Sequence, residues 1–493
     1  MAFALLLTSA NAQEITDALR YSIDNLNGTA RFRAMGGAFG ALGGDLSSIN
    51  VNPAGSAIFT NNQVGVTLNN YNTKNKSTYF GTKTSDSENN FDINQAGGVF
   101  VFKNNHNNAK WTKIAVAVNY ENANNFDNAQ FSAGVNPTNS IDQYFLKFAN
   151  GIPLDVLNTI DYAAMTNAEQ QAFLGYNGYI INPVSNSSNN TQYTSNVPQS
   201  VNYYQENGIQ STGYNGKLSF NFSSSYKDRL FIGVNLNSHF SNFTQSSVFY
   251  EDNNNVLTNQ DRINRIQFNN DLYTHGTGFS FQLGTIAKIT EGLRLGLAYE
   301  SPTWYNFSDE LTQRLSAVRS STFGELPTDV VDPKITNFYD PYRLQTPSKF
   351  TGSLAYVFAK KGLISVDYSI KDYGNTKFRP TNDAHFKGLN TTMNTDLDTA
   401  GELRIGAEYK IKALSLRGGY RMEQSPYKNK TTMGDLTSYS GGLGYNFGST
   451  RVDLAYTFAK RNTQQGFFAR GLTDAASIDI INNNISLTVL FEL

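Results

Sequence analysis

Few side chains of this 493-residue chain could act as catalysts. It contains no Cys, which excludes thiolate nucleophiles, disulfide bonds and Cys-ligated metal centres. His239 shares one face of a predicted strand with Asn237 and Ser241, the residue types of a hydrolase triad. Because triad members normally converge from different elements, a structural histidine is the better interpretation, and a hydrolase is the least favoured alternative. The other candidate bases are His106, His275 and His385.

Other binding chemistry has equally little support in the sequence. Residues 251–255 (Glu-Asp-Asn-Asn-Asn) and the pair Asp329 and Asp332 could offer oxygens to Ca²⁺, but they lack a regular ligand spacing. The glycines of residues 36–44 fit neither of the common phosphate-binding motifs. With 39 basic and 40 acidic residues, the net charge of -1 gives no field that would attract nucleic acid. We therefore predict no cofactor, no metal and no nucleic-acid partner.

Alternation of apolar and polar residues is the main pattern along the chain. Ile114, Val116, Val118 and Tyr120, for example, alternate with polar or small neighbours, which indicates a β-strand. The longest apolar run, residues 2–7, is too short for a membrane-spanning helix. The pattern predicts fourteen strands, at residues 64–71, 95–102, 113–121, 214–222, 230–243, 279–286, 293–299, 350–358, 364–370, 403–409, 414–420, 439–447, 452–458 and 485–493.

The connections between these strands alternate between short and long. An even number of strands, with short turns on one side and long polar loops on the other, is typical of bacterial outer-membrane barrels. A soluble β-sandwich also has regular short strands, but a closed barrel leaves no exposed edge in an exported protein. We predict an all-β fold, a fourteen-stranded antiparallel transmembrane β-barrel at residues 63–493, with both termini periplasmic. Its extracellular loops are predicted at residues 122–211, 244–274, 306–349, 371–401, 422–438 and 459–484.

The segments before the barrel and in its first long loop need separate explanations. Residues 1–12 have the apolar stretch and the Ala-Asn-Ala ending of a signal peptide remnant, so the mature chain would begin at Gln13. Residues 13–62 are too rich in Gly and Ala for a barrel strand, and we predict that they form a hatch inside the lumen. An amphipathic helix over residues 154–174 would pack on the barrel rim or, less favourably, form an outer collecting groove.

Several short motifs along the mature chain are similar to those of one known family. They are Gly44-Asp45 with Asn52-Pro53-Ala54-Gly55, Tyr299-Glu300-Ser301-Pro302, Thr346-Pro347-Ser348-Lys349-Phe350 and Gly444-Tyr445-Asn446-Phe447-Gly448. With these motifs the chain resembles the outer-membrane long-chain fatty acid transporters and the related aromatic-hydrocarbon channels, particularly members from Bacteroidetes. The resemblance implies a fourteen-stranded barrel closed by a hatch, through which apolar substrates enter, bind in the lumen and leave sideways. Family members have a break in the third strand as the exit, whereas residues 114–120 contain no Gly or Pro to mark one.

These observations predict a monomeric passive channel that takes hydrophobic small molecules through the outer-membrane lipid. Glu402, Arg404, Arg417 and Arg421 would face the lumen, where they either pair with one another and fix the hatch or contact a substrate carboxylate. The alternative from another class is a shuttle protein of type IX secretion with the same fold, a protein partner at its extracellular loops and no substrate flux. The residues predicted to form the moving part of the hatch are Gly44, Asp45, Asn52, Pro53, Ala54 and Gly55.

Overall fold

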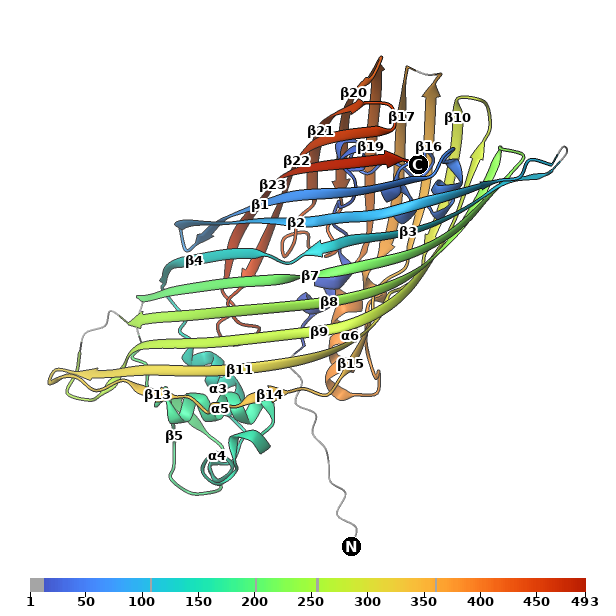
Figure 1. Cartoon of the computed structure of the whole chain (residues 1–493). Coiled ribbons are helices and arrows are strands. Elements are labelled where there is room, and N and C mark those ends of the chain that lie inside the picture. The colour runs from blue at the N-terminus through green and yellow to red at the C-terminus, as the bar shows by residue number, and fades with distance from the viewer. Residues whose placement is uncertain (1–12, 107–108, 200–201, 254–256, 360) are drawn as a thin grey trace, which may run out of the picture.

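A closed antiparallel β-barrel of fourteen wall strands forms most of the described chain, as predicted (Figure 1). The computed structural model describes residues 13–106, 109–199, 202–253, 257–359 and 361–493, so the predicted signal remnant lies outside the described residues. Each strand pairs with the next, and β23 pairs with β1 to close the wall. The wall strands are β1 (Gln63–Tyr79), β2 (Thr82–Lys103), β3 (Trp111–Asn125), β7 (Tyr203–Tyr226), β8 (Leu230–Asn253), β9 (Arg262–Lys288), β10 (Leu293–Glu300), β16 (Lys349–Phe358), β17 (Gly362–Asp372), β19 (Thr399–Ile411), β20 (Leu414–Glu423), β21 (Leu436–Asn446), β22 (Thr450–Gly466) and β23 (Ala475–Glu492).

Two neighbouring wall strands are interrupted at the same level. After β10 the chain continues as β11 (Trp304–Ser321), and β15 (Tyr342–Gln345) precedes β16. Pro302 and Pro347 lie in the two gaps, because proline has no N–H to donate to a sheet. The Thr303 N–H instead donates to the Thr346 hydroxyl at 2.9 Å. The edge of β11 is covered by β12 (Gly324–Glu325), β13 (Asp329–Val331), β14 (Thr336–Phe338) and β15, while β18 (Lys377–Arg379) pairs with β15.

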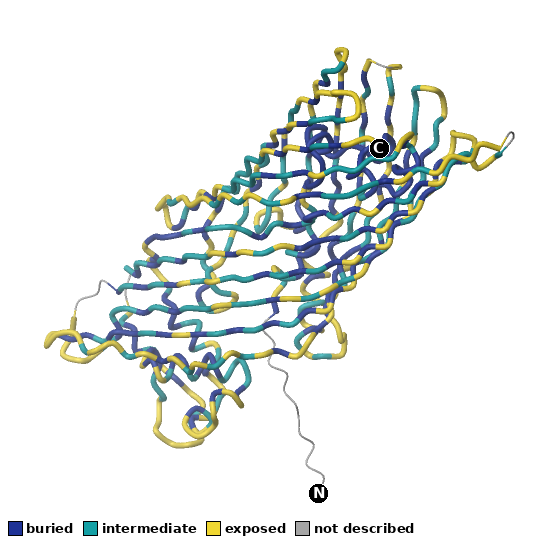
Figure 2. Tube along the Cα trace, viewed as in Figure 1, coloured by how far each residue is buried: buried dark blue, intermediate teal, exposed yellow. Residues whose placement is uncertain are grey.

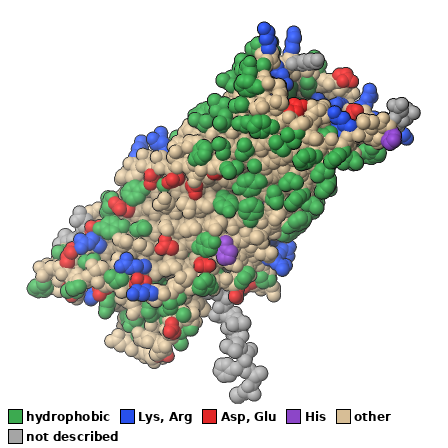
Figure 3. All heavy atoms as spheres, viewed as in Figure 1, with side chains coloured by type: hydrophobic (Ala, Val, Ile, Leu, Met, Phe, Trp, Pro, Cys, Tyr) green, Lys and Arg blue, Asp and Glu red, His purple; other side chains and the backbone are tan. Residues whose placement is uncertain are grey.

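Apolar side chains form a lipid-facing belt around the end of the barrel that carries the short turns. On β8, Leu230, Ile232 and Leu236 are exposed, whereas the alternate residues Asn235 and Asn237 are buried toward the lumen. Figure 3 shows the hydrophobic side chains gathered over this half of the visible face. The belt is what the period-two pattern of the sequence encodes. None of the helices in the described part of the chain has the length and apolar character needed to cross a bilayer.

Several strands run far beyond this belt, and here the predicted loop boundaries are wrong. β7, β8 and β9 contain 24, 24 and 27 residues, whereas about 9–11 residues suffice to cross a membrane. Most of predicted loop 244–274 is therefore a β8–β9 hairpin, and predicted loop 459–484 is largely β22 and β23. On these extensions the outward face contacts water instead of lipid, so the apolar alternation that identifies a membrane strand is lost.

A small helical cap, residues 137–197, lies on the rim at the end away from the short turns (Figure 1). The predicted helix over residues 154–174 is divided into α4 (Leu154–Thr159), η3 (Tyr162–Ala164) and α5 (Asn167–Asn177). Leu154, Leu157 and Leu174 are buried in one cluster with Phe249 of β8 and Leu315 of β11, so this segment packs on the rim. The cap consists of α3 (Asp142–Ala149), α4 (Leu154–Thr159), α5 (Asn167–Asn177), β5 (Ile181–Pro183) and β6 (Tyr193–Ser195), and the 371–401 region contributes η4 (Tyr373–Asn375) and α6 (Ala384–Asp396).

The segment before β1 lies inside the barrel, where most of its residues are buried (Figure 2). It contains α1 (Ile15–Ser22), α2 (Ala30–Ala34), η1 (Leu46–Asn50) and η2 (Pro53–Ile58). Gln13 donates to Asp309 of β11 at 2.6 Å, beyond the lipid-facing belt. At the short-turn end, Leu493 donates its N–H to the Asn62 carbonyl. Residues 13–62 thus run from the long-strand half of the lumen to the end with the short turns. We call them the hatch.

Candidate functional site

The lower hatch, residues 28–58, docks directly on glycines of the barrel wall. A Cβ added at Gly233 of β8 would lie 2.5 Å from the Pro53 carbonyl carbon and oxygen and 2.6 Å from the Ala54 nitrogen. Such approaches exclude any side chain and place hatch backbone against wall backbone. The other wall glycines whose added Cβ would collide with the hatch are Gly284, Gly296, Gly406, Gly419 and Gly442.

Amide side chains fasten this docking. The Asn52 side chain donates to the Gly40 carbonyl at 2.7 Å and to the Thr285 carbonyl of β9 at 3.0 Å. Asn221 of β7 donates to the Pro53 carbonyl at 2.9 Å. The Asn-Pro sequence thus connects the lower hatch to two wall strands through buried polar contacts.

The remaining predicted hatch residues hold the lower hatch in its own fold. Asp45 accepts hydrogen bonds from the Thr29 hydroxyl and the Ser47 N–H, and so begins η1. The Gly44 N–H donates to the Gly55 carbonyl at 3.1 Å, and Ala54 is fully buried against the wall. The predicted set therefore assembles in one place, as a buried and well-bonded substructure.

One buried ionic network joins the lower hatch to the wall. Glu408 accepts from Arg31 of the hatch at 2.8 Å and from Arg417 at 2.7 Å. Arg417 also donates to Asp453 at 2.7 Å. The predicted lumen residue Arg417 therefore belongs to a structural anchor, and its hatch partner Arg31 was missed because 377 residues separate Arg31 from Glu408.

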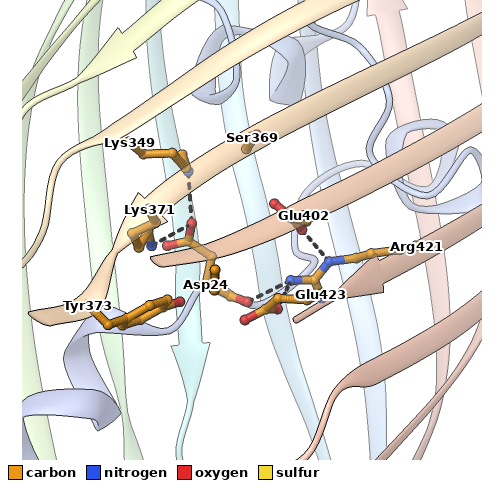
Figure 4. A pocket seen from close by; sticks show the side chains of 9 residues that line it. Asp24, Lys349, Ser369, Lys371, Tyr373, Glu402, Arg421 and Glu423 are labelled. Carbon is orange, nitrogen blue, oxygen red and sulfur yellow. Dashed lines mark hydrogen bonds and ion pairs between the residues drawn. The ribbon is translucent and has the colours of Figure 1, made fainter. Parts of the chain in front are cut away.

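The other predicted lumen residues form a second network around Asp24 (Figure 4). Glu402 accepts a bidentate pair of hydrogen bonds from Arg404 at 2.8 and 2.7 Å, and it also pairs with Arg421. Arg421 donates to the Asp24 main-chain carbonyl at 3.0 Å. The sequence thus predicted three members of this network but not the hatch residue that they surround.

Asp24 is held by two lysines of the wall. Its carboxylate lies 2.8 Å from Lys349 Nζ and 2.9 Å from Lys371 Nζ, and Lys349 also pairs with Glu300 at 2.8 Å. Burial alone would raise the pKa of Asp24, but the two ammonium groups hold it well below its usual range. Glu300, Lys349 and Lys371 occupy paired positions on β10, β16 and β17, so the sheet register places them side by side.

An apolar cluster surrounds α1 just before Asp24. α1 contributes Ala18, Leu19 and Tyr21, and Tyr21 packs against Phe307 with ring centroids 4.3 Å apart. The cluster extends to the ionic network, because Tyr373 and Ala400 belong to it and also line the cavity beside Asp24. Its other buried members are Phe126, Phe243, Tyr305, Tyr342, Leu344, Phe378, Phe386, Met393, Leu397 and Tyr427.

His239 is part of a buried polar network rather than a triad. Its Nε2 lies 2.9 Å from the Ser280 hydroxyl, and its Nδ1 lies 3.3 Å from the Tyr305 hydroxyl. Ser241, the serine of the hydrolase alternative, instead donates to the Tyr214 carbonyl. The residues described do not place three His, Asp or Glu side chains together as metal ligands.

The third strand is interrupted, but after Asn125 and not within residues 114–120. β3 ends at Asn125, and β4 (Asn128–Asn136) continues its direction and pairs with β7. β2 has a backbone ladder with β3 only from Gln95 to Lys103, so residues 82–94 have no such ladder on this side within the described chain. We call this boundary the β2–β3 seam. Asp92 accepts from the side chains of Asn122 at 2.6 Å and Asn125 at 3.2 Å across it.

Comparison with known proteins agrees with this architecture. The family model described as outer membrane protein transport protein (OMPP1/FadL/TodX) matches residues 158–476, more than half of the chain. The chain belongs to this family. Its members are transport channels of the outer membrane and not enzymes, so this β-barrel is an outer-membrane protein.

Solved structures share the fold at low sequence identity. A Pseudomonas aeruginosa FadL homologue is 11% identical, with a TM-score of 0.57 over 96% of this chain and 99% of that one. The Pseudomonas putida toluene transporter TodX is 15% identical, with a TM-score of 0.51 over 95% and 99% of the two chains. The Ralstonia pickettii toluene transporter TbuX is 14% identical, with a TM-score of 0.50 over 95% of this chain and 100% of that one. No match is found among curated protein sequences.

Proposed function

We propose that this FadL/TodX-type barrel is a passive outer-membrane channel for hydrophobic small molecules, with the hatch as its internal closure. The observation that carries the proposal is the apolar cluster around α1, which lies inside a polar-lined lumen and is filled by the protein's own helix. An apolar ligand gains about 0.8 kcal/mol for each CH₂ that it buries, so capture from water needs no energy source. Relatives described as toluene transporters support this substrate class.

We further propose a route for the substrate. It would enter between the long strands, displace part of the upper hatch, residues 13–27, and leave through the β2–β3 seam into the bilayer. Phe91 and Ile93 of β2, exposed by 66% and 54%, offer an apolar surface beside that seam. The side-chain bonds of Asp92 close the seam without a backbone ladder, so it opens at a lower cost than a hydrogen-bonded strand pair.

The proposal also gives the orientation in the membrane. The short turns and Leu493 would face the periplasm, and the cap and long hairpins would face outward. Because Gln13 lies in the lumen beyond the belt, the prediction that both termini are periplasmic has support only at the C-terminus. The predicted monomer, the Bacteroidetes origin and a protein partner at the extracellular loops stay predictions.

Uptake by cells that lack their own transporter tests the proposal. Cells that express the protein should accumulate labelled toluene or oleate faster than cells that express an outer-membrane β-barrel that does not transport hydrophobic compounds. Heat-modified migration on gels verifies that the barrel is folded and inserted. If inserted protein increases the uptake of neither compound, the channel proposal fails for both substrate classes.

A further inference from the structure

Basic residues are concentrated at the end of the barrel that carries the short turns. The described residues of the six short turns include 11 of the 39 Lys and Arg residues of the chain but only two of its 40 Asp and Glu residues. Glu492, at the end of β23, adds one carboxylate to this end. Because the whole chain has a net charge of -1, the excess of positive charge belongs to this end alone. We call these turns the basic rim, which comprises residues 103–106, 109–113, 226–230, 288–294, 359, 361–362, 409–413 and 446–451.

Most exposed cations of the basic rim have no carboxylate partner among the described residues. The rim cations that do form ion pairs are Lys410, 3.8 Å from Glu408, and Arg451, 2.9 Å from Asp453. Asp228 follows Lys227 directly, but its carboxylate accepts from the Thr112 hydroxyl at 2.9 Å. The protein therefore leaves this positive charge available to an external anion. Figure 3 shows Lys and Arg side chains projecting at this end of the barrel. The exposed cations without an ion pair in the described chain are Lys103, Lys110, Lys227, Arg229, Lys361 and Lys412.

The basic rim lies directly beside exposed aromatic side chains. Phe102 and Trp111 are 61% and 46% exposed, and they adjoin Lys103 and Lys110 in the sequence. The Trp111 ring packs edge-on against Tyr226 at 5.3 Å, and Lys227 Nζ lies 5.6 Å from the centre of the Tyr226 ring. Aromatic residues of this kind mark the level of the lipid headgroups, where long basic side chains also extend. The rim cations therefore lie at the depth of the lipid phosphates.

The distribution of the basic rim favours lipid over a protein partner. The rim cations occur in turns between β2 and β3, β7 and β8, β9 and β10, β16 and β17, β19 and β20, and β21 and β22. These turns are spread around the closed wall, which a lipid leaflet contacts along its whole circumference. A protein partner would instead cover one patch of about 800 Å².

We propose that the basic rim binds anionic phospholipid headgroups and enriches them around the short-turn end of the barrel. This inference goes beyond transport and takes from the proposed function only the orientation, by which this leaflet is the periplasmic one. The attraction is between Lys or Arg and the net negative charge of the headgroup, so a zwitterionic phospholipid gains much less. One such contact corresponds to a preference of roughly fivefold.

The two tryptophans of the chain allow this preference to be measured at each end of the belt. Trp111 belongs to the basic rim, whereas Trp304 pairs with Phe279 of β9, whose rim turn begins at Lys288. Trp304→Phe leaves Trp111 as the single reporter, and Trp111→Phe leaves Trp304. Each variant is reconstituted in bilayers that contain brominated phosphatidylglycerol or brominated phosphatidylcholine, and quenching of its fluorescence gives the relative binding of the two lipids. We expect Trp111 to report a roughly fivefold preference for phosphatidylglycerol and Trp304 to report almost none.

Charge variants then test whether the rim lysines cause the preference. In the Trp304→Phe protein, the combined changes Lys103→Gln, Lys110→Gln and Lys227→Gln should reduce the preference at Trp111 to less than about twofold. The matched control combines Lys74→Gln, Lys76→Gln and Lys83→Gln, which remove the same charge from exposed positions of the β1–β2 hairpin at the other end. The control should keep the full preference. Heat-modified migration on gels verifies that each variant is folded.

The outcomes separate this inference from its alternatives. Equal quenching by the two lipids at Trp111 overturns it and leaves the rim cations to an acidic protein partner. An unchanged preference in the triple rim variant also overturns it, because the lysines would then not be the cause. An equal preference at Trp304 overturns it as well, because the attraction would not be specific to the rim. A preference that behaves as expected in a protein that takes up no hydrophobic compound supports the lipid site and refutes the channel proposal alone.

Discussion

The fit between the lower hatch and the wall predicts a strong effect from adding one methyl group. In Gly233→Ala, the new Cβ would lie 2.5 Å from two atoms of the Pro53 carbonyl, and ordinary contacts begin at 3.4 Å. The neighbours would have to shift by about 0.9 Å, and they are backbone atoms that cannot rotate away. Overpacking of this kind costs about 1–3 kcal/mol, and the Asn221 bond to Pro53 contributes about 1 kcal/mol more.

A loss of about 2–4 kcal/mol in docking energy should be measurable by hydrogen exchange. At about 1.4 kcal/mol per factor of ten, the amides of residues 50–56 should exchange roughly 30- to 700-fold faster in Gly233→Ala. Gly352→Ala is the matched control, because an added Cβ there meets nothing within 4 Å. Equal exchange in the two variants would refute the reasoning that backbone contact with wall glycines holds the lower hatch.

Three further predictions concern the seam and the two ionic networks. The double variant Asp92→Cys, Asn122→Cys can form one disulfide across the seam, because the chain has no other Cys. This disulfide should lower uptake until a reductant is added. Unaltered uptake by the cross-linked protein would argue against exit through the seam. Because the pKa of Asp24 is lowered in the folded protein, its ion pairs stabilise the upper hatch at every pH above the unfolded pKa near 3.8. This contribution is lost only as the pH falls through the lower folded pKa. A spin label at residue 25 should therefore show the same mobility at pH 5 and pH 8, and greater mobility at pH 5 would contradict the pairing. Glu408→Gln should lower the free energy of unfolding in urea by about 3–5 kcal/mol, because it leaves buried arginines unpaired. The half-exposed pair in Asp479→Asn should cost less than about 1 kcal/mol, so equal losses in the two variants would count against a buried anchor.

The sequence predicted the part of the fold that the membrane dictates. Each of the fourteen predicted strands overlaps a wall strand, because lipid imposes an apolar residue at every second position. Strand extensions such as β8 beyond Phe243 carry polar residues on both faces, so the sequence pattern predicts loops at these positions. The prediction of one helix over residues 154–174 was wrong because α4, η3 and α5 turn to bury Leu157 and Leu174 in a common core.

The candidate site was predictable only where its signals are local. The Gly- and Ala-rich segment and its Asn52-Pro53 pair pointed to a hatch, but its partners come from distant strands. Asp24 and Lys349 are 325 residues apart, and only the closure of the barrel brings them together. One local signal does mark the docking surface: glycines such as Gly233 and Gly284 occupy inward positions of predicted strands, where they indicate the close approach of another backbone.

The two halves of the hatch differ in how they are held, and this difference bears on which half moves. The lower hatch combines backbone contacts to wall glycines with the fully buried Glu408 network, so any displacement breaks many contacts together. The upper hatch is attached through α1 in an apolar cluster and through the accessible carboxylate of Asp24. A hydrophobic ligand of the proposed channel would replace the apolar contacts of α1 with equivalent ones. An exchange of equivalent contacts has a small net free energy, so the upper hatch can be released by ligand while the lower hatch keeps the barrel closed to water.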